Sequence, residues 1–286
     1  MPNLKEIRNR ISSIGSTMQI TSAMKMVSAA KLKKAQDAIT AMRPYSSKLT
    51  ELLQSLSATL DSDAGGAFSE QREVKKVLLV SITSNRGLCG GFNSSIVKET
   101  INTIENTYQG VDVDLLTIGK KGDDILSKSY NVIENKNEVF DNLTYDNVAL
   151  VAEMIMDLYV DGAYDKIEII YNRFKNAATQ IVEVEQFLPI QQAEEGVNTN
   201  FDYIFEPSKE KIVLELIPKS LKTQLYKAVR DSFAAEHGAR MTAMHKATDN
   251  AKDLRDDLLL TYNKARQAAI TNEILEIVGG AEALNN

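Results

Sequence analysis

The sequence predicts a mixed fold of class α plus α/β, in which the two ends of the chain form a long antiparallel coiled coil and the middle forms an α/β domain. Three observations predict it. Apolar residues near both ends recur at alternating intervals of three and four, as on the seam of a coiled coil. Glycine and proline are scarce in those end segments. Between the ends, β-branched runs alternate with helical patterns, which is typical of an α/β layer.

The N-terminal segment, residues 1–60, is predicted to be one helix of the coiled coil. No proline occurs between Pro2 and Pro44, and Gly15 is the only glycine there. We expect a kink at Pro44 and a helix over 3–59, about 80 Å long at 1.5 Å per residue. The apolar seam comprises Leu4, Ile7, Ile11, Ile14, Met18, Leu32, Ala35, Ile39, Met42, Leu49, Leu52, Leu56 and Leu60.

The C-terminal segment, residues 207–286, is predicted to be the second helix. Apart from Gly238, nothing after Pro218 interrupts a helix before Gly279. The spacing predicts a helix over 208–278, about 100 Å long, and helices of such length are typical of coiled coils. The α/β domain returns the chain toward the base of the first helix, so we expect antiparallel pairing. The predicted seam comprises Ala251, Leu254, Leu258, Thr261, Ala265, Ala268, Asn272 and Leu275.

The middle segment, residues 74–190, is predicted to be a Rossmann-like α/β domain whose sheet is parallel at first. Its strand candidates are "KKVLLVSIT", "VDVDLLTIG", "YNVIEN", "KIEIIYNRF" and "ATQIVEVEQFLP". Its helix candidates are "SSIVKETINTIENTY", "GDDILSKS" and "DNVALVAEMIMDLYVDG". A linker is expected at 61–73, and a second linker that includes a foot is expected at 191–206.

Charge is unevenly distributed along the chain. The net charge is −6, yet residues 1–48 carry nine Lys or Arg against two acids. Residues 207–286 carry twelve basic and eleven acidic side chains, so 49–206 holds −6 − 7 − 1, or −14. A basic arm on an acidic protein indicates an acidic partner surface, which leaves nucleic acid and protein open. The arm lacks the interleaved aromatic residues that stack on bases, which disfavours nucleic acid.

Motifs for catalysis and for metal binding are lacking in the sequence. Cys89 is the single cysteine, and the two histidines, His237 and His245, have no cysteine partner, so we expect neither a disulfide framework nor a metal site. The turn "SNRGLCGGFN" between a strand and a helix places its glycines at 87, 90 and 91. That spacing matches neither the phosphate loop nor the dinucleotide fingerprint. We therefore interpret it as a packing turn and expect no cofactor.

Polar residues interrupt the predicted seam. Thr21, Ser22 and Lys25 do so in the first helix, and Gln267, Thr271 and Asn272 do so in the second. Polar groups at a seam cost stability unless they are satisfied, so partner subunits that enclose the coil would explain them. The C-terminal "EILEIVGGAEAL" is mildly apolar, which would suit an apolar sleeve.

Three blocks resemble a known family. The N-terminal "IRNRISSIGSTMQITSAMKMVSAAKLKKAQ", the "RGLCGGFN" turn and the C-terminal "YNKARQAAITNEILEIVGGA" are together similar to the γ subunit of the F-type ATP synthase. The resemblance spans the whole chain. The last block resembles the signature of that family through Ile270, Thr271, Glu273, Glu276 and the pair Gly280-Ala281.

The resemblance implies a non-catalytic rotor shaft of the proton-translocating enzyme. Such a shaft stands inside a ring of three α and three β subunits, one copy to three of each. Its base contacts the ε subunit and the membrane c-ring. It transmits torque during ATP synthesis or hydrolysis and has no active site of its own. The implied location is the cytoplasmic side of a bacterial inner membrane, as a peripheral protein attached through the complex.

The resemblance also implies roles for individual residues. Lone Cys89 lacks the partner that the chloroplast form uses as a thiol switch. Phe205 stands where tyrosine is frequent, so a hydrogen bond from a hydroxyl there is lost. The residues implied in coupling and in β-subunit contact are Met24, Lys25, Lys31, Lys33, Lys34, Arg86, Arg240, Gln267 and Thr271. The residues implied in c-ring and ε contact are Tyr203, Phe205 and Glu206.

Two other classes of function remain open from the residues alone. A coiled-coil adaptor or scaffold would form a stable particle without α and β subunits. A nucleotide-binding α/β enzyme with helical arms would bind ATP as an isolated chain.

Overall fold

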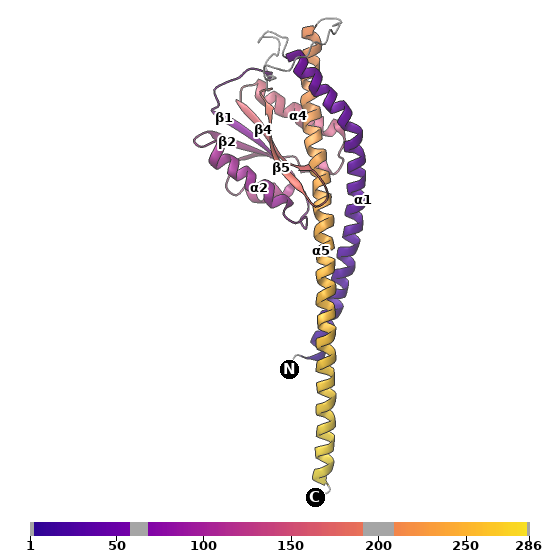
Figure 1. Cartoon of the computed structure of the whole chain (residues 1–286). Helices are drawn as coiled ribbons and strands as arrows, with labels where there is room; N and C mark the ends of the chain where they lie inside the picture. The colour runs from indigo at the N-terminus through magenta and orange to yellow at the C-terminus, as the bar shows by residue number, and fades with distance from the viewer. Residues whose placement is uncertain (1–2, 58–67, 191–208, 285–286) are drawn as a thin grey trace. The chain divides into compact units, whose positions relative to one another are not determined.

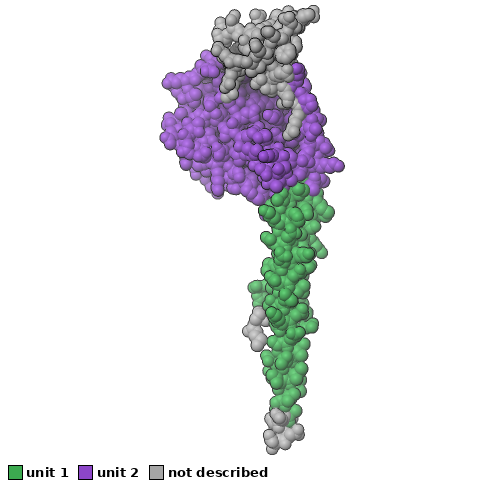
Figure 2. Space-filling view, viewed as in Figure 1, with its two compact units in different colours: residues 1–28, 241–286 green, residues 29–240 purple. Residues whose placement is uncertain are grey.

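The computed structural model describes residues 3–57, 68–190 and 209–284. The chain divides into two compact units, which Figure 2 colours separately. Unit 1 comprises residues 1–28 and 241–286, and unit 2 comprises residues 29–240. Two long helices, α1 (Leu4–Ser57) and α5 (Lys209–Leu284), each contribute residues to both units.

Unit 2 contains a five-stranded sheet in the order β3-β2-β1-β4-β5. Figure 1 labels four of these strands, β1, β2, β4 and β5. The strands are β1 (Lys76–Ile82), β2 (Asp112–Ile118), β3 (Val132–Asn135), β4 (Lys166–Phe174) and β5 (Gln180–Leu188). The first four pair in parallel and β5 pairs antiparallel to β4. All five lie within the β-branched runs of the sequence, and the predicted α/β layer is confirmed.

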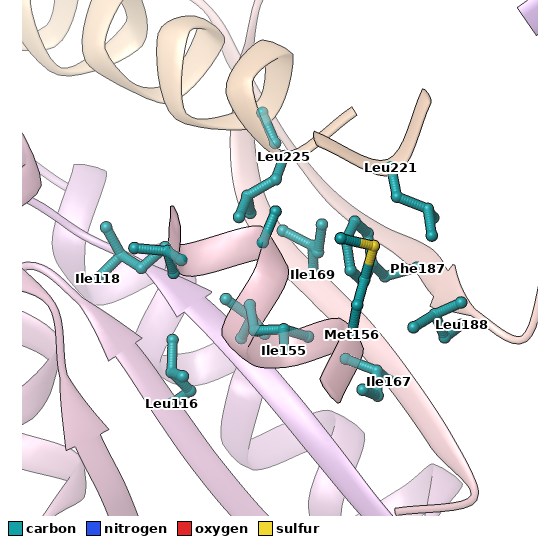
Figure 3. Packing of buried hydrophobic residues seen from close by; sticks show 14 of the residues in the cluster. Leu116, Ile118, Ile155, Met156, Ile167, Ile169, Phe187, Leu188, Leu221 and Leu225 are labelled. Atoms are coloured by element: carbon teal, nitrogen blue, oxygen red, sulfur yellow. The ribbon is translucent and has the colours of Figure 1, made fainter. Parts of the chain in front are cut away.

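Helices cover both faces of this sheet. Residues 78, 80 and 82 of β1 face a cluster with α4 (Tyr145–Val160) and α5, whereas residues 77 and 79 face a cluster with α2 (Phe92–Asn102) and α3 (Lys120–Leu126). This alternation follows from the period of two in a strand. Because both faces are covered, the parallel strands are apolar almost throughout. Figure 3 shows the first cluster, in which Leu221 and Leu225 of α5 lie near Phe187 of β5.

Local signals set the boundaries of the shorter helices. The Thr144 hydroxyl accepts a hydrogen bond from the backbone N–H of Asn147 and caps the N-terminus of α4. After α2 the chain continues as a π-helical segment, Thr103–Thr107, within the run predicted as one helix. A short 3₁₀ helix, Asn137–Phe140, precedes α4.

Neither internal proline nor the glycine pair ends the long helices. Pro44 lies inside α1 and Pro218 lies inside α5. Helix α5 continues to Leu284, so the end predicted at 278 is wrong. Gly279 and Gly280 are exposed and close to no other group, and a glycine costs a helix only about 1 kcal/mol relative to alanine. That penalty is too small to end a helix by itself.

The seam of α1 in unit 1 is regular in spacing, although its chemistry changes. Ile7, Thr21 and Ser28 are buried, and Met18 and Lys25 between them are half-buried. These positions keep the alternation of three and four that Leu4 begins. The polar stretch at 21–28 therefore continues the packed face of the helix and does not interrupt it.

The seam of α5 in unit 1 differs from the predicted one by a shift after Ala251. Leu254 is 52% exposed and Thr261 is exposed, whereas Arg255 and Tyr262 are half-buried. Starting from Ala251, both a three-four and a four-three alternation fit the sequence, and the structure adopts the second. Arg255 and Tyr262 suit such positions because a long aliphatic stem or an aromatic ring packs while its polar end reaches water.

Two cross-helix contacts fix the register in unit 1. The Arg8 Nη2 donates to the Tyr262 hydroxyl at 2.8 Å. The hydroxyls of Thr21 and Thr248 lie 2.8 Å apart, and the Thr248 hydroxyl also reaches the Met244 carbonyl at 2.8 Å. The residue numbers fall in one helix as they rise in the other, so the predicted antiparallel pairing is confirmed. The two threonines satisfy each other's hydroxyl groups inside the seam.

Gly119 connects β2 to α3 in a conformation that only glycine adopts easily. Its φ is +115°, and a Cβ built there would lie 2.3 Å from the Thr83 carbonyl oxygen. That carbonyl belongs to the residue directly after β1, whose backbone N–H donates to the Ile118 carbonyl of β2 at 2.8 Å, so relieving the clash would require a shift of paired backbone.

We expect Gly119→Ala to lower the free energy of unfolding of the purified chain by at least about 3 kcal/mol, because strain and a backbone clash coincide. Gly110→Ala is the matched control, since its φ is also positive, +79°, but open space surrounds it. That control should cost about 1–2 kcal/mol. Equal losses for the two variants in guanidinium titrations would contradict the clash.

The paired threonines predict a non-additive double-mutant cycle. Thr21→Val and Thr248→Val should each lower the free energy of unfolding by about 0.5–1.5 kcal/mol, since each removes a hydrogen bond across the seam. The double variant should lose at least about 0.5 kcal/mol less than the sum. Thr17→Val, whose hydroxyl bonds only the Ser13 carbonyl of its own helix, is the control. Strict additivity would show that the hydroxyls are not coupled.

Candidate functional site

The residues implied in coupling fall into both units. Unit 1 holds Met24, Lys25, Gln267 and Thr271. Unit 2 holds Lys31, Lys33, Lys34, Arg86 and Arg240. Tyr203, Phe205 and Glu206 lie outside the described residues.

The antiparallel register of unit 1 separates Met24 from the C-terminal pair. Thr21 lies opposite Thr248, so Met24 lies level with the region of His245. Gln267 is about 22 residues further along α5, which is roughly 30 Å at 1.5 Å per residue. Met24 and Gln267 therefore do not meet within this unit.

The last turns of α5 extend beyond the N-terminus of α1. Arg8 lies level with Tyr262, so the first residues of α1 reach only to about residue 266. From Arg266 to Ala281 every described side chain is exposed. The Thr271 hydroxyl donates to the backbone carbonyl of Gln267 at 2.9 Å, and the Gln267 side chain is exposed. We call residues 266–284 the tip, and its exposed large apolar residues are Ile270, Ile274, Leu275, Ile277 and Val278.

The lysines of α1 in unit 2 lie on the outer face of that helix. Lys31, Lys33 and Lys34 are exposed, whereas Leu32 and Ala35 are buried at 6% and 1% exposure. Lys33 and Lys34 are therefore solvated, while the charge of Lys31, although exposed, also acts on the buried His237 and Glu236. The charges of these lysines are available to a partner, and exposed ion pairs contribute about 0–1 kcal/mol each.

The turn between β1 and α2, which we call the glycine turn (residues 84–93), is built by side chain to backbone hydrogen bonds. The Ser84 hydroxyl donates to the Arg86 carbonyl at 2.7 Å, and the Ser84 amide donates to Asn93 Oδ1 at 2.9 Å. The Asn93 side-chain amide donates to Cys89 Sγ at 3.3 Å. Cys89 is buried at 2% exposure, and burial raises the pKa of its thiol. Hydrogen bonds among Ser84, Asn93 and Cys89 therefore hold the two ends of the turn together.

Leu88 carries the strain of the glycine turn. Its φ is +63°, in the left-handed region that costs an L-residue about 1–2 kcal/mol, and the next positive φ, +60°, is at Gly90. Leu88 is also 66% exposed, so it gains no burial in return. Arg86 beside it is exposed as well.

Arg240 of α5 donates hydrogen bonds to the backbone of the glycine turn. Its Nη2 donates to the carbonyls of Arg86 at 3.0 Å and Gly87 at 3.3 Å. Its Nη1 donates to Glu236 Oε1 at 2.5 Å, one helical turn earlier. Arg240 and Glu236 are 6% and 7% exposed, so this is a buried, hydrogen-bonded ion pair.

His237 completes the surroundings of the ion pair. Burial, assisted by the positive charges of Arg240 and Lys31, lowers the pKa of His237 to about 3, so the ring is neutral at physiological pH. Its Nδ1 lies 3.4 Å from Arg240 Nη1, and its ring meets Phe233 edge-on at 4.5 Å. Burial also raises the pKa of the Glu236 carboxyl, against the opposing charges of Arg240, Lys31 and Arg86.

Sequence reasoning missed Glu236 and the burial of Arg240. One signal was available, because Glu236 and Arg240 are spaced four apart, as in an ion pair on a helix face. A second signal was the surrounding density of small residues at 234, 235, 238 and 239, which permits close approach of another backbone. A Cβ at Gly238 would lie 3.1 Å from Ala177 Cα in the β4–β5 connection.

The carboxyl ends of the parallel strands use their hydrogen-bonding groups within the protein. The Thr83 hydroxyl accepts from the Gly122 amide at 2.9 Å, and Asn85 Oδ1 accepts from the Lys120 amide at 3.0 Å. These are the amides at the start of α3 that would bind an anion in a nucleotide-binding relative of this fold.

Residues 3–57, 68–190 and 209–284 contain no group of three or more His, Cys, Asp or Glu side chains placed to hold a metal ion. No helix within them combines the length and apolarity needed to cross a bilayer.

Comparisons with known proteins agree over the full length of the chain. A family model described as ATP synthase matches residues 3–284. The ATP synthase gamma chain of Flavobacterium psychrophilum is 73% identical over 286 residues, with 99% of each chain covered. The ATP synthase gamma chain of Flavobacterium johnsoniae is 71% identical over 286 residues, with 100% of each chain covered.

Solved structures show the same fold. A chain of the central stalk and c-ring structure of the Tetrahymena thermophila mitochondrial ATP synthase has a TM-score of 0.60 and 26% identity, with 80% of this chain and 99% of that chain covered. A chain of the Euglena gracilis mitochondrial ATP synthase has a TM-score of 0.71 and 22% identity, with 98% and 94% covered.

Proposed function

The chain belongs to the ATP synthase gamma-chain family, as part of the central rotor of that complex, and on this premise we propose how its helix pair carries torque. The observation that supports the proposal is the antiparallel pair in unit 1, with the tip of α5 continuing alone beyond it. Two helices joined along a seam resist bending and twisting better than one. The tip is a single helix, and its different faces expose different side chains.

The asymmetry of such a shaft is what acts on the catalytic subunits. Three identical β subunits around it would each meet a different face. A ligand changes the conformational balance of a protein only as far as it binds one state better than another. The faces of the shaft therefore hold the three β subunits in different nucleotide-affinity states, and rotation exchanges those states. We propose that this chain itself makes and breaks no bond in ATP.

The proposed partners follow from the same role. One copy of this chain stands within three α and three β subunits and binds the ε subunit and the c-ring, with no nucleic acid in its function. Met24, Lys25, Gln267 and Thr271 contact the ring, as do the outer lysines of α1 and Arg86. Tyr203, Phe205 and Glu206 form the foot on ε and the c-ring. The chain lies on the cytoplasmic side of a bacterial inner membrane and is attached to it through the complex.

Contacts of a rotor have to be weak enough to be left behind at each step. The exposure of Lys31, Lys33 and Lys34 suits this requirement, because solvated ion pairs are individually weak and reform without a desolvation penalty. The apolar residues of the tip suit it as well, since contacts without directional hydrogen bonds permit sliding. The contacts between the two helices along the seam then stay the same during rotation, and the contacts that change lie on the outer surface of the helix pair.

Co-expression with the α, β and ε subunits of the same organism tests the assembly. We expect a purified complex with one copy of this chain per three β subunits, and ATP-driven rotation of a bead attached to it. The isolated chain should bind no ATP tightly in equilibrium dialysis. A particle that forms without α and β and does not rotate would contradict the proposal and favour an adaptor.

Charge reversal tests the electrostatic contacts. Lys33→Glu with Lys34→Glu should lower single-molecule torque or the yield of assembled complex, because two attractions of up to about 1 kcal/mol each become repulsions. Lys98→Glu with Lys128→Glu is the control, since those lysines are also exposed, on the sheet domain, and the change of charge is the same. Unchanged torque and assembly in the first variant would dispose of the idea.

A further inference from the structure

The glycine turn projects two side chains outward and is held by one guanidinium. Arg86 and Leu88 are exposed, while the carbonyls of Arg86 and Gly87 accept hydrogen bonds from Arg240. Leu88 holds a positive φ of +63°. A strained residue that is also solvent-exposed persists only when its surroundings determine its backbone, and such residues are frequent at functional sites.

The contact of Arg240 is specific to a guanidinium. One nitrogen binds Glu236, and the other binds the two carbonyls, so a planar fork joins α5 to the turn. The ion pair is buried, and Glu236 is the carboxylate that compensates the charge. A lysine at this position would keep the charge but has a single nitrogen, which cannot reach the carboxylate and both carbonyls in the same geometry.

We propose that Glu236 and Arg240 are positioning residues, which clamp the glycine turn so that Arg86 and Leu88 are presented to the β subunits in one fixed orientation. This inference rests on the proposed function, because it assigns a purpose to the side chains that the turn displays. Neither Glu236 nor Arg240 touches the partner in this account. Both act through the carbonyls of residues 86 and 87.

The clamp explains why a flexible-looking sequence is ordered. Three glycines in eight residues would leave "RGLCGGFN" with many conformations, and ordering them costs conformational entropy. Ser84 and Asn93 fix the two ends of the turn through the hydrogen bonds at 2.7 and 2.9 Å. Arg240 fixes its middle, where Leu88 is strained. A contact that deforms when force is applied would transmit less torque. A rigid backbone in the middle of the glycine turn therefore favours the transfer of torque.

Hydrogen–deuterium exchange in the assembled complex with α and β subunits tests the clamp directly. In Arg240→Lys and in Glu236→Gln, we expect the amides of residues 85–91 to exchange about tenfold faster, and those of β1, residues 76–82, to be unchanged. Circular dichroism and assembly yield establish that each variant folds. If Arg240→Lys fails to assemble, Glu236→Gln carries the test, because it keeps the shape of the side chain.

Arg230→Lys is the matched control. Arg230 lies on the same helix and its Nη2 also donates to a backbone carbonyl, that of Leu143, at 3.0 Å. The Leu143 carbonyl lies outside the glycine turn, whose hydrogen bond to this region runs from the Asn85 side chain to the Asn137 carbonyl, so exchange at 86–91 should not change. If exchange at 85–91 is unchanged in both clamp variants, or rises equally in Arg230→Lys, the clamp is refuted.

Rotation assays test the second half of the inference. Arg240→Lys should lower kcat for ATP-driven rotation by several-fold with little change in KM, because nucleotide sites are elsewhere. Arg86→Ala should lower kcat without faster exchange at 85–91. In the double variant, Arg240→Lys with Arg86→Ala, kcat should fall no further than in the more affected single variant, since both changes disrupt the same contact. Additive losses would overturn the link between clamp and contact.

The two proposals fail separately. A wild-type complex that does not rotate would refute the proposed function, whatever the exchange rates. A wild-type complex that rotates, with Arg240→Lys rotating equally well, would refute the clamp alone.

Discussion

The burial of the C-terminal helix along residues 217–240 is the constraint on which the rest of unit 2 depends. One face of this stretch, with Ile217, Leu221 and Leu225 fully or nearly buried, completes the core that the sheet and α4 begin. Further along, small residues allow the helix to approach the β4–β5 connection closely, so that even a methyl group at Gly238 would meet Ala177. Without this helix the sheet would expose a face of apolar residues.

This burial also determines where polar groups are allowed. Arg240 and Glu236 lie on the buried stretch, and two buried charges are tolerated only when they are paired and hydrogen-bonded. The glycine turn supplies the remaining acceptors through its carbonyls. In unit 1 the threonine pair meets the same requirement with neutral hydroxyls. The Arg240–Glu236 pair and the threonine pair are thus satisfied inside the protein, and the partners are left to contact exposed side chains.

The division between buried and exposed side chains also separates the packed seam of the long helices from the surfaces available to partners. Seam positions of α1, such as Ile7, Leu32 and Ala35, are buried, while the lysines beside them are solvated. Among the described residues of unit 1, the tip of α5 extends beyond the start of α1 and exposes its apolar residues. A shaft of the ATP synthase has to be rigid along its length and adaptable at its surface, and these two sets of residues have those properties.

The sequence by itself determined the elements and their order. The alternation of three and four predicted the long helices, β-branched runs predicted all five strands, and the alternation of strands with helices predicted an α/β layer that is parallel at first. The exposure of Lys33 and Lys34 followed from the seam positions beside them. Helix and strand formation and the exposure of a side chain on a helix depend on neighbours a few residues away in sequence. A periodic sequence pattern can therefore predict them.

The tertiary structure alone decided which of two equivalent faces of α5 packs, and what Arg240 binds. From Ala251 onward, Leu254 and Arg255 both fit an alternating seam, and only the position of the partner helix selects Arg255. Arg240 and Arg86 are 154 positions apart in sequence, so no local pattern joins them. Contacts of this kind follow from how folded elements meet, because burial and hydrogen-bond partners are properties of the surroundings of a residue and not of its neighbours along the chain.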